Sequence, residues 1–263
     1  MKQAANASAE KSALRLEGRL SVMGALAGGR RKIDRLFVDR AMDERRKFEL
    51  KDAAWRAGVK IEWRKRPDMD TMTGGKQHGG VVAMAGLRSD PGLSELKETE
   101  NLRFVVMLDG VEDPYSYGHC VRAFYTAGVD LLIRSPREWG PAEAIIARAS
   151  GGCSELINTA VAEVQPAADW CRERGFQILT SAKTEDSISL FDVEFGSKIC
   201  LLIGGEKRGI TRSFLSAADK VISIPYGRET EMSLGTVAAG SILAYEVMRR
   251  AGVVGSSAAT QTD

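Results

Sequence analysis

Residues 104–135, FVVMLDGVEDPYSYGHCVRAFYTAGVDLLIRS, carry the pattern on which the fold depends. The segment begins with a short, continuous apolar run, which is typical of a buried parallel strand. Residues 118–129 then predict a helix, and residues 130–135 predict the next strand. Strands that alternate with helices indicate a mostly parallel sheet covered on both faces. This part of the chain is therefore expected to form an α/β domain.

The same alternation continues toward the C-terminus. Helices are expected around 141–149 and 153–174, near a short segment with Val161 and Val164, then strands at 176–181, 198–205 and 220–226, and a last helix at 236–250. Residues 253–263 are small and polar, which predicts a disordered tail. We therefore place this domain at residues 102–252.

The first part of the chain predicts a smaller α/β domain at residues 13–87. The pattern indicates a helix at 16–29, a strand at 32–40, a helix at 43–58, and strands at 60–66 and 79–86. The polar residues 88–101, which include Pro91 and Gly92, predict a linker between the two domains.

Composition excludes several classes of protein. The sequence has no run of about 18 apolar residues, so no membrane span is expected. Its 4 cysteines are far apart and form no C-x-x-C pair, which fits neither a zinc site nor a small disulfide scaffold. We expect a reduced, cytoplasmic protein without a metal ion.

Charge is distributed unevenly along the 263 residues. Residues 1–90 contain 20 Lys and Arg against 12 Asp and Glu, a balance of +8, whereas the remainder contains 17 against 23, a balance of −6. Such asymmetry is typical of a polyanion-binding front domain joined to a neutral or acidic body. Ordinary solvated helix surface explains the composition equally well.

Three loops that follow apolar strands are candidates for a site, because ligands of open α/β sheets bind at the carboxyl ends of the strands. In the first, Arg122 lies on the early turns of a helix, where the helix dipole does not favour a cation. This placement suggests that Arg122 binds an external anion, although a solvated helix arginine is the simpler alternative. The second loop, 201–211, has paired glycines that let the backbone approach a ligand, followed by the lone carboxylate of Glu206.

The third loop runs from 222 to 246, ISIPYGRETEMSLGTVAAGSILAYE. Ser233 lies shortly before a helix that is rich in small residues, and such a helix lets another backbone pack very closely. Small-residue helices are also common in protein cores. With two histidines, His78 and His119, the sequence indicates neither a Ser-His-Asp triad nor a metal cluster.

Taken in order, the three loops resemble the signature motifs of the SpoU (TrmH-like) branch of the SPOUT RNA 2′-O-ribose methyltransferases. DPYSYGHCVRAFYTAGV resembles the first motif, IGGEKRGI the second, and IPYGRETEMSLGTVAAGSILAYE the third. The front end, with LEGRLSVMGAL and KQHGGVVA, resembles the small RNA-binding domain that precedes the catalytic domain in many members. The resemblance implies methyl transfer from S-adenosylmethionine to a ribose 2′-hydroxyl of structured RNA, with ribosomal RNA slightly preferred over transfer RNA.

The resemblance also implies a deep trefoil knot, a homodimer and a set of site residues. Arg122 would bind the adjacent phosphate and stabilise a developing alkoxide, and Glu206 and Ser233 match the characteristic residues of the second and third motifs. The cofactor pocket would use the residues Gly204, Ile224 and Leu234, with Gly205 and Ser181 as further candidates.

Two positions depart from the family pattern. Ser116 stands where the family usually has an asparagine in the first motif, and Gly235 where it has one in the third. Losing a side-chain hydrogen bond typically costs about 0.5–1.5 kcal/mol. An RNA-binding or assembly factor that is catalytically weak or silent is therefore the alternative function.

For the front domain we expect RNA binding dominated by phosphate contacts, with an affinity that falls steeply with salt. The residues expected to contact RNA are Arg30, Arg31, Lys32, Arg64, Lys65, Arg66, Lys76 and His78. For His78, a structural role in the turn is an equally good interpretation.

Overall fold

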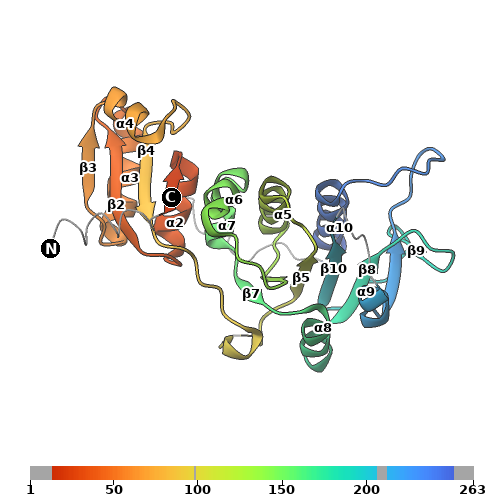
Figure 1. Ribbon diagram of the computed structural model, residues 1–263. Helices are drawn as coiled ribbons and strands as arrows, with labels where there is room; N and C mark the ends of the chain where they lie inside the picture. Colours follow the sequence, from red (N-terminus) through yellow and green to blue (C-terminus); the bar gives the residue numbers. More distant parts are fainter. Residues whose placement is uncertain (1–13, 98, 206–211, 252–263) are drawn as a thin grey trace, which may run out of the picture. The chain divides into compact units, whose positions relative to one another are not determined.

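The chain forms two compact units in the computed structural model, which describes residues 14–97, 99–205 and 212–251 (Figure 1). The first unit contains the described residues up to Ser89 together with Glu138–Leu156. The second contains Asp90–Arg137 and the described residues from Ile157 onward. Residues 138–156 thus belong to the first unit, although in the sequence they lie inside the segment 102–252 that was predicted to form the second domain.

The first unit is built on a four-stranded sheet in the order β1-β4-β2-β3, in which β4 is antiparallel to both neighbours and β2 is parallel to β3. Its strands are β1 (Leu14–Glu17), β2 (Ile33–Asp39), β3 (Ile61–Arg64) and β4 (Val81–Ala85), and its first helices are α2 (Arg19–Gly28), α3 (Glu44–Arg56) and α4 (Arg66–Thr73). Leu36 and Phe37 are neighbours in β2, so their side chains point to opposite faces. Leu36 belongs to the larger core, and Phe37 packs with Met69 of α4.

The later segment of the first unit packs tightly against α2. It forms η2 (Gly140–Ala142), α6 (Glu143–Ala149) and α7 (Cys153–Leu156). A Cβ atom at Gly24 of α2 would lie 2.5 Å from the carbonyl oxygen of Gly152, and Ala147 of α6 is buried in the larger core. The backbone of α2 at Gly24 therefore approaches the backbone of Gly152 to a distance that only glycine allows.

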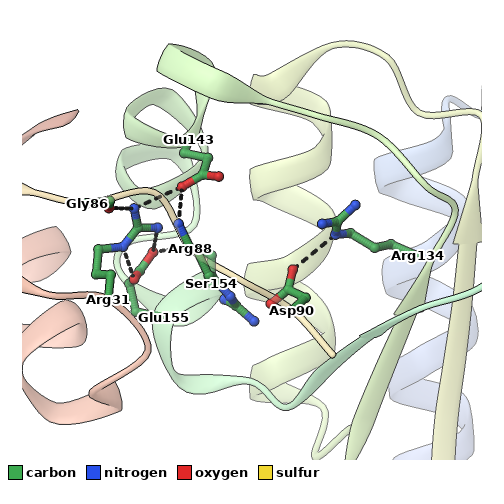
Figure 2. Close-up of polar contacts among 8 residues, drawn as sticks. All are labelled: Arg31, Gly86, Arg88, Asp90, Arg134, Glu143, Ser154 and Glu155. Carbon is green, nitrogen blue, oxygen red and sulfur yellow. Dashed lines mark hydrogen bonds and ion pairs between the residues drawn. The ribbon is translucent and has the colours of Figure 1, made fainter. Parts of the chain in front are cut away.

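A buried ion-pair cluster holds the same segment in place (Figure 2). The Arg31 side chain is 1% exposed, and its Nε and Nη2 donate to the two carboxylate oxygens of Glu155 at 2.8 and 3.0 Å. Its Nη1 donates to Glu143 at 2.9 Å and to the carbonyl oxygen of Gly86 at 3.0 Å. Burial by itself lowers the pKa of Arg31, but Glu155 and Glu143 outweigh it and raise the pKa overall. Arg31 is therefore a permanently charged centre of this unit.

The second unit contains a seven-stranded sheet in the order β7-β6-β5-β10-β8-β11-β9, and all of its strand pairs are parallel. The strands are β5 (Phe104–Asp109), β6 (Leu131–Arg134), β7 (Thr159–Val161), β8 (Gln177–Ser181), β9 (Ile188–Ser189), β10 (Ile199–Gly204) and β11 (Lys220–Ser223). The helices are η1 (Leu93–Glu95), α5 (Pro114–Thr126), α8 (Val164–Glu173), α9 (Arg212–Ala217) and α10 (Thr236–Ala251). The predicted α/β fold with a parallel sheet is confirmed.

Several local predictions are wrong. The helix expected at 16–29 is preceded by strand β1, and it begins after Gly18. The helix expected at 153–174 is two helices, α7 and α8, separated by strand β7. Helix α4 and strand β9 were not predicted. The missed strands have two to four residues, too few for a periodicity to be read, and they form through pairing with distant strands.

Two residues near the start of the predicted linker at 88–101, Arg88 and Asp90, make polar contacts to other parts of the chain (Figure 2). The Arg88 N–H donates to Glu143 of the first unit at 3.0 Å. Two residues later, the Asp90 carboxylate pairs with Arg134 of the second unit at 3.1 Å, and both side chains are largely buried. The carbonyl oxygen of Pro91 then accepts a hydrogen bond from the N–H of Val161 at 2.9 Å. Ser89 alone separates the two attachments.

Candidate active site

A cavity of about 630 Å³ opens at the carboxyl ends of β8, β10 and β11, next to the start of α10. This is the edge where open α/β sheets bind ligands, and the volume is in the range of small-molecule sites. Its walls come from five segments: Ser181, Ala182, Lys183 and Thr184; Leu202, Ile203, Gly204 and Gly205; Leu215 of α9; Ser223, Ile224 and Tyr226; and Ser233, Leu234, Gly235, Thr236, Ala239 and Leu243.

Hydrogen bonds to Tyr226 and Lys183, two residues that line the cavity, hold the loop between β11 and α10. The Leu234 N–H donates to the Tyr226 hydroxyl at 2.9 Å. The Lys183 ammonium donates to the carbonyl oxygen of Thr230 at 3.4 Å and lies 6.0 Å from the centroid of the Tyr226 ring. Tyr226 thus contacts the Ser233–Leu234 segment directly, and Lys183 contacts the same loop at Thr230.

The end of β10 contributes backbone to the cavity. The Thr236 hydroxyl donates to the carbonyl oxygen of Gly204 at 3.2 Å, which connects the start of α10 to this strand. A Cβ atom at Gly205 would clash with the backbone of Gly110 and lie 2.7 Å from the nitrogen of Val111. The paired glycines were expected to let the backbone approach a ligand, and Gly205 also lets two loops of the protein approach each other.

The structure brings most of the predicted pocket residues together. Ser181, Gly204, Gly205, Ile224 and Leu234 all line the cavity, although they come from three separate strand ends and the start of a helix. Ser233 lines it as well. Glu206 lies outside the described residues.

Arg122 lies apart from these residues. It is exposed on α5 and is absent from the cavity lining. The ring of Phe124, two residues later, packs against α10, where a Cβ atom at Gly240 would lie 3.2 Å from it. The Tyr245 hydroxyl of α10 donates to the Thr126 hydroxyl of α5 at 3.0 Å. Helices α5 and α10 thus lie side by side, with Arg122 on the solvent side of the pair.

The loop before α5 is closed by a helix cap. The Asp113 carboxylate accepts a hydrogen bond from the Ser116 N–H at 2.7 Å. This N–H, and then the Ser116 hydroxyl, lower the pKa of Asp113. Ser116 therefore stabilises the helix start at the position where an asparagine was expected.

Two residues expected to contact RNA have structural roles instead. Arg31 is buried between Glu155 and Glu143, so the prediction that it binds a phosphate is wrong. The imidazole of His78 is 0% exposed. Its Nδ1 accepts from the Gly80 N–H at 3.1 Å, so Nε2 carries the proton and donates to Asp70 at 2.7 Å. For His78, the structural interpretation is the correct one.

The other predicted RNA contacts lie nearer the surface. Lys32 pairs with Asp34 at 2.6 Å, Arg64 with Glu62 at 2.8 Å, and Arg66 with Asp39 at 3.6 Å. A phosphate would have to compete with these carboxylates. Lys65 and Lys76 are exposed and Arg30 is half-buried. The RNA contacts of these six residues stay predictions.

Among the cavity residues that were not predicted from the sequence, Lys183, Tyr226 and Thr236 have side chains that hydrogen-bond to the backbone. Lys183 lies two residues after the end of strand β8, which is a local signal of the kind used for the other loops. Thr236 begins α10, whereas Tyr226 had no signal because its role depends on the fold of its own loop. Among residues 14–97, 99–205 and 212–251 no group of three metal ligands is found. Within the same residues no helix has the length and hydropathy needed to span a bilayer.

Family models match most of the chain. The SpoU rRNA Methylase family model matches residues 103–245, and the model for RNA 2′-O ribose methyltransferase substrate binding matches residues 15–89. One relative is a 23S rRNA (guanosine-2′-O-)-methyltransferase RlmB of Coxiella burnetii, 27% identical over 235 residues, which covers 88% of this chain and 93% of that protein. An RlmB of Burkholderia sp is 29% identical over 185 residues, 69% of this chain and 74% of that protein.

Solved structures share the fold. The AdoMet-bound rRNA methyltransferase from Sinorhizobium meliloti superposes with a TM-score of 0.72 at 23% identity, covering 91% of this chain and 88% of that one. The SpoU methyltransferase AviRb from Streptomyces viridochromogenes, in complex with AdoMet, gives 0.71 at 20% identity, covering 92% and 91%. Both matches extend over nearly the whole length of the chain.

Proposed function

This chain belongs to the SpoU rRNA methylase family, and from that premise we propose that it transfers a methyl group from S-adenosylmethionine to a ribose 2′-hydroxyl of ribosomal RNA. One observation carries the proposal: three loops far apart in the sequence, at the ends of β8, β10 and β11, converge on a single cavity. The preceding domain matches a model for RNA 2′-O-ribose methyltransferase substrate binding. The curated relatives that act on 23S rRNA make ribosomal RNA the substrate class of choice.

The residues present fit S-adenosylmethionine. The cavity of about 630 Å³ combines apolar walls with backbone groups at Gly204 and Ile224 and the hydroxyls of Ser181 and Ser233. Such a mixture is typical of cofactor sites. When bound, the cofactor supplies an electrophilic methyl group. We propose that Gly204, Ile224 and Leu234 hold it, with Gly205 and Ser181 at the edges.

Arg122 is proposed to bind the phosphate next to the reacting ribose and to stabilise the alkoxide that develops on its oxygen. A guanidinium stays protonated and can hydrogen-bond a phosphate with two N–H groups at once. Because Arg122 does not line the cavity of its own chain, we propose that it acts in a homodimer built on α5 and α10. These helices expose Tyr115, Tyr125, Ile242 and Tyr245.

The homodimer predicts a mass of twice 28.5 kDa in solution. Replacing Ile242 with aspartate should convert the protein to a monomer, since a charge in an apolar interface loses its hydration. Light scattering after size-exclusion chromatography measures the mass. A wild-type monomer at micromolar concentration would contradict the dimer.

Replacing Arg122 with alanine is expected to reduce kcat for methyl transfer by about 10²-fold or more, the usual effect of removing one donor to a developing oxyanion. S-adenosylmethionine affinity should not change, because Arg122 is absent from the cavity lining. Arg103→Ala is the matched control: Arg103 is exposed just before β5, at the opposite edge of the sheet. Turnover that stayed at the wild-type level in Arg122→Ala, with RNA still bound, would remove Arg122 from the site.

The trefoil knot is also part of the proposal. It is supported by the insertion of β10 between β5 and β8, and by the passage of the Gly205 backbone against that of Gly110. We further propose a cytoplasmic location, because Cys120, Cys153, Cys171 and Cys200, all within the described residues, form no disulfide. Hydrogen bonding to the Cys171 thiol and burial raise the pKa of Cys200, which keeps this thiol neutral.

A catalytically silent RNA-binding factor is the second candidate, because Gly235 lines the cavity without the amide that the family usually has there. The test combines calorimetry with S-adenosylmethionine and transfer of a labelled methyl group to total RNA, followed by mapping of 2′-O-methyl sites. Methylation of ribosomal RNA supports the enzyme. Cofactor binding without transfer to any RNA favours the silent factor.

A further inference from the structure

Most basic side chains in the first unit are already paired with a carboxylate. Ion pairs of 2.6–3.6 Å occupy the basic residues Arg15, Arg19, Lys32, Arg35, Arg45, Arg46, Lys47, Arg56, Arg64 and Arg66. Arg40 and Lys51 differ from them. Neither has a carboxylate within 4.0 Å among the described residues. Their charges are therefore available to an external anion.

Arg40 and Lys51 share a cavity of about 360 Å³ between α3 and β3, together with Glu44, Lys47 and Trp63. Glu44, Lys47 and Lys51 lie three and four residues apart on α3, so they are on one face of this helix. The single carboxylate of the cavity, that of Glu44, pairs with Lys47 at 2.8 Å. Two positive charges remain uncompensated.

Both remaining cations are held in place by Trp63 instead of by an acid. The Arg40 Nε donates to the carbonyl oxygen of Trp63 at 3.2 Å, and neither of its terminal amino groups has an acceptor among the described residues. The Lys51 ammonium lies 5.5 Å from the centroid of the Trp63 ring. An aromatic ring orients a cation without cancelling its charge. The arrangement thus resembles a prepared anion site.

We propose that this cavity binds a phosphate of the RNA backbone, with Arg40 and Lys51 as ligands and Trp63 as the residue that positions them. The proposal rests on the proposed RNA-methylating function. It assigns an RNA-contacting surface to the first unit of the protein. Arg40 would bind the phosphate oxygens through both terminal amino groups, and Lys51 would act as a point charge. Arg40 and Lys51 are exposed, so an extended polyanion can reach both of them.

The test measures binding of purified large-subunit ribosomal RNA to the full chain over a series of salt concentrations. The double variant Arg40→Gln/Lys51→Gln should raise Kd about tenfold and reduce the slope of log Kd against log salt by about one, the value for one lost phosphate contact. The matched control is Arg45→Gln/Arg56→Gln, which removes the same charge from α3 at two exposed, acid-paired positions. This control should change Kd about twofold or less.

Trp63 is tested by rescue. Trp63→Leu should weaken binding and reduce the salt slope, whereas Trp63→Phe, which keeps an aromatic face, should restore both. Equal losses in both variants, with unchanged melting temperatures, would contradict the positioning role.

Three outcomes would overturn the site. The first is a double variant with the wild-type Kd and slope, and the second is an equal loss in the control pair. The third is displacement of the RNA by inorganic phosphate at constant ionic strength, from the wild type but not from the double variant, which would indicate a small-anion site. Failure of the proposed function is distinguishable, because the wild type would then methylate no ribosomal RNA.

Discussion

Replacing Arg31 with leucine should destabilise the first unit by about 3–5 kcal/mol, the usual effect of removing one partner from a buried ion pair. Arg31 makes four hydrogen bonds, to Glu155, Glu143 and Gly86, from a side chain that is 1% exposed. Without it, the Glu155 carboxylate is left in the interior with a nearby like charge at Glu143. Unfolding of this unit should begin where residues 138–156 pack against α2.

Hydrogen exchange of the amides in β2, β4 and α6 measures the loss of stability of the first unit by itself. A global denaturant curve does not, because the two units need not unfold together. Arg56→Leu is the control: its ion pair with Asp52 is exposed on both sides, and its loss should cost less than about 1 kcal/mol. Arg31→Lys should fall between the two, since one ammonium cannot bind both oxygens of Glu155 as a guanidinium does. Equal protection in Arg31→Leu and Arg56→Leu would disprove the role of the cluster.

Replacing Gly205 with alanine should weaken S-adenosylmethionine binding more than tenfold and destabilise the second unit by about 1–3 kcal/mol or more, which is the cost of overpacking. The added methyl group would meet the backbone of Gly110 and Val111, and backbone cannot rotate away as a flexible side chain does. The end of β10 would have to move. The cavity edge formed by Gly204 and Gly205 would move with it.

Gly227→Ala is the matched control in the same unit. Gly227 is exposed, and a Cβ atom there meets no atom within 4 Å. Calorimetry with S-adenosylmethionine and thermal unfolding should both give wild-type values for this control. A Gly205→Ala protein that binds the cofactor normally would show that the two loops can separate without affecting the pocket.

Part of the candidate site could be predicted because its signals are local. Gly204 and Gly205 follow an apolar strand, and Ser233 and Leu234 precede a helix of small residues. Both patterns lie within a few residues, and parallel strands bring their carboxyl ends to one edge. The cavity there contains all five predicted cofactor residues. Arg122 was found by the same reasoning, but its place relative to the cavity depends on α5, which turns it toward solvent.

The sequence by itself determined the α/β class, the parallel sheet and the loops that form the pocket, since periodicity and turn residues act over short distances along the chain. Only the tertiary structure decided which basic side chains are available to RNA. Arg31 and Lys32 are adjacent in the sequence, yet Arg31 is buried against Glu155, 124 residues away, and Lys32 is exposed. Arg40 and Lys51 were not among the residues predicted to contact RNA, yet neither has a carboxylate within 4.0 Å among the described residues, and both contact Trp63. Pairing depends on which carboxylates the fold brings near, and no local pattern contains that information.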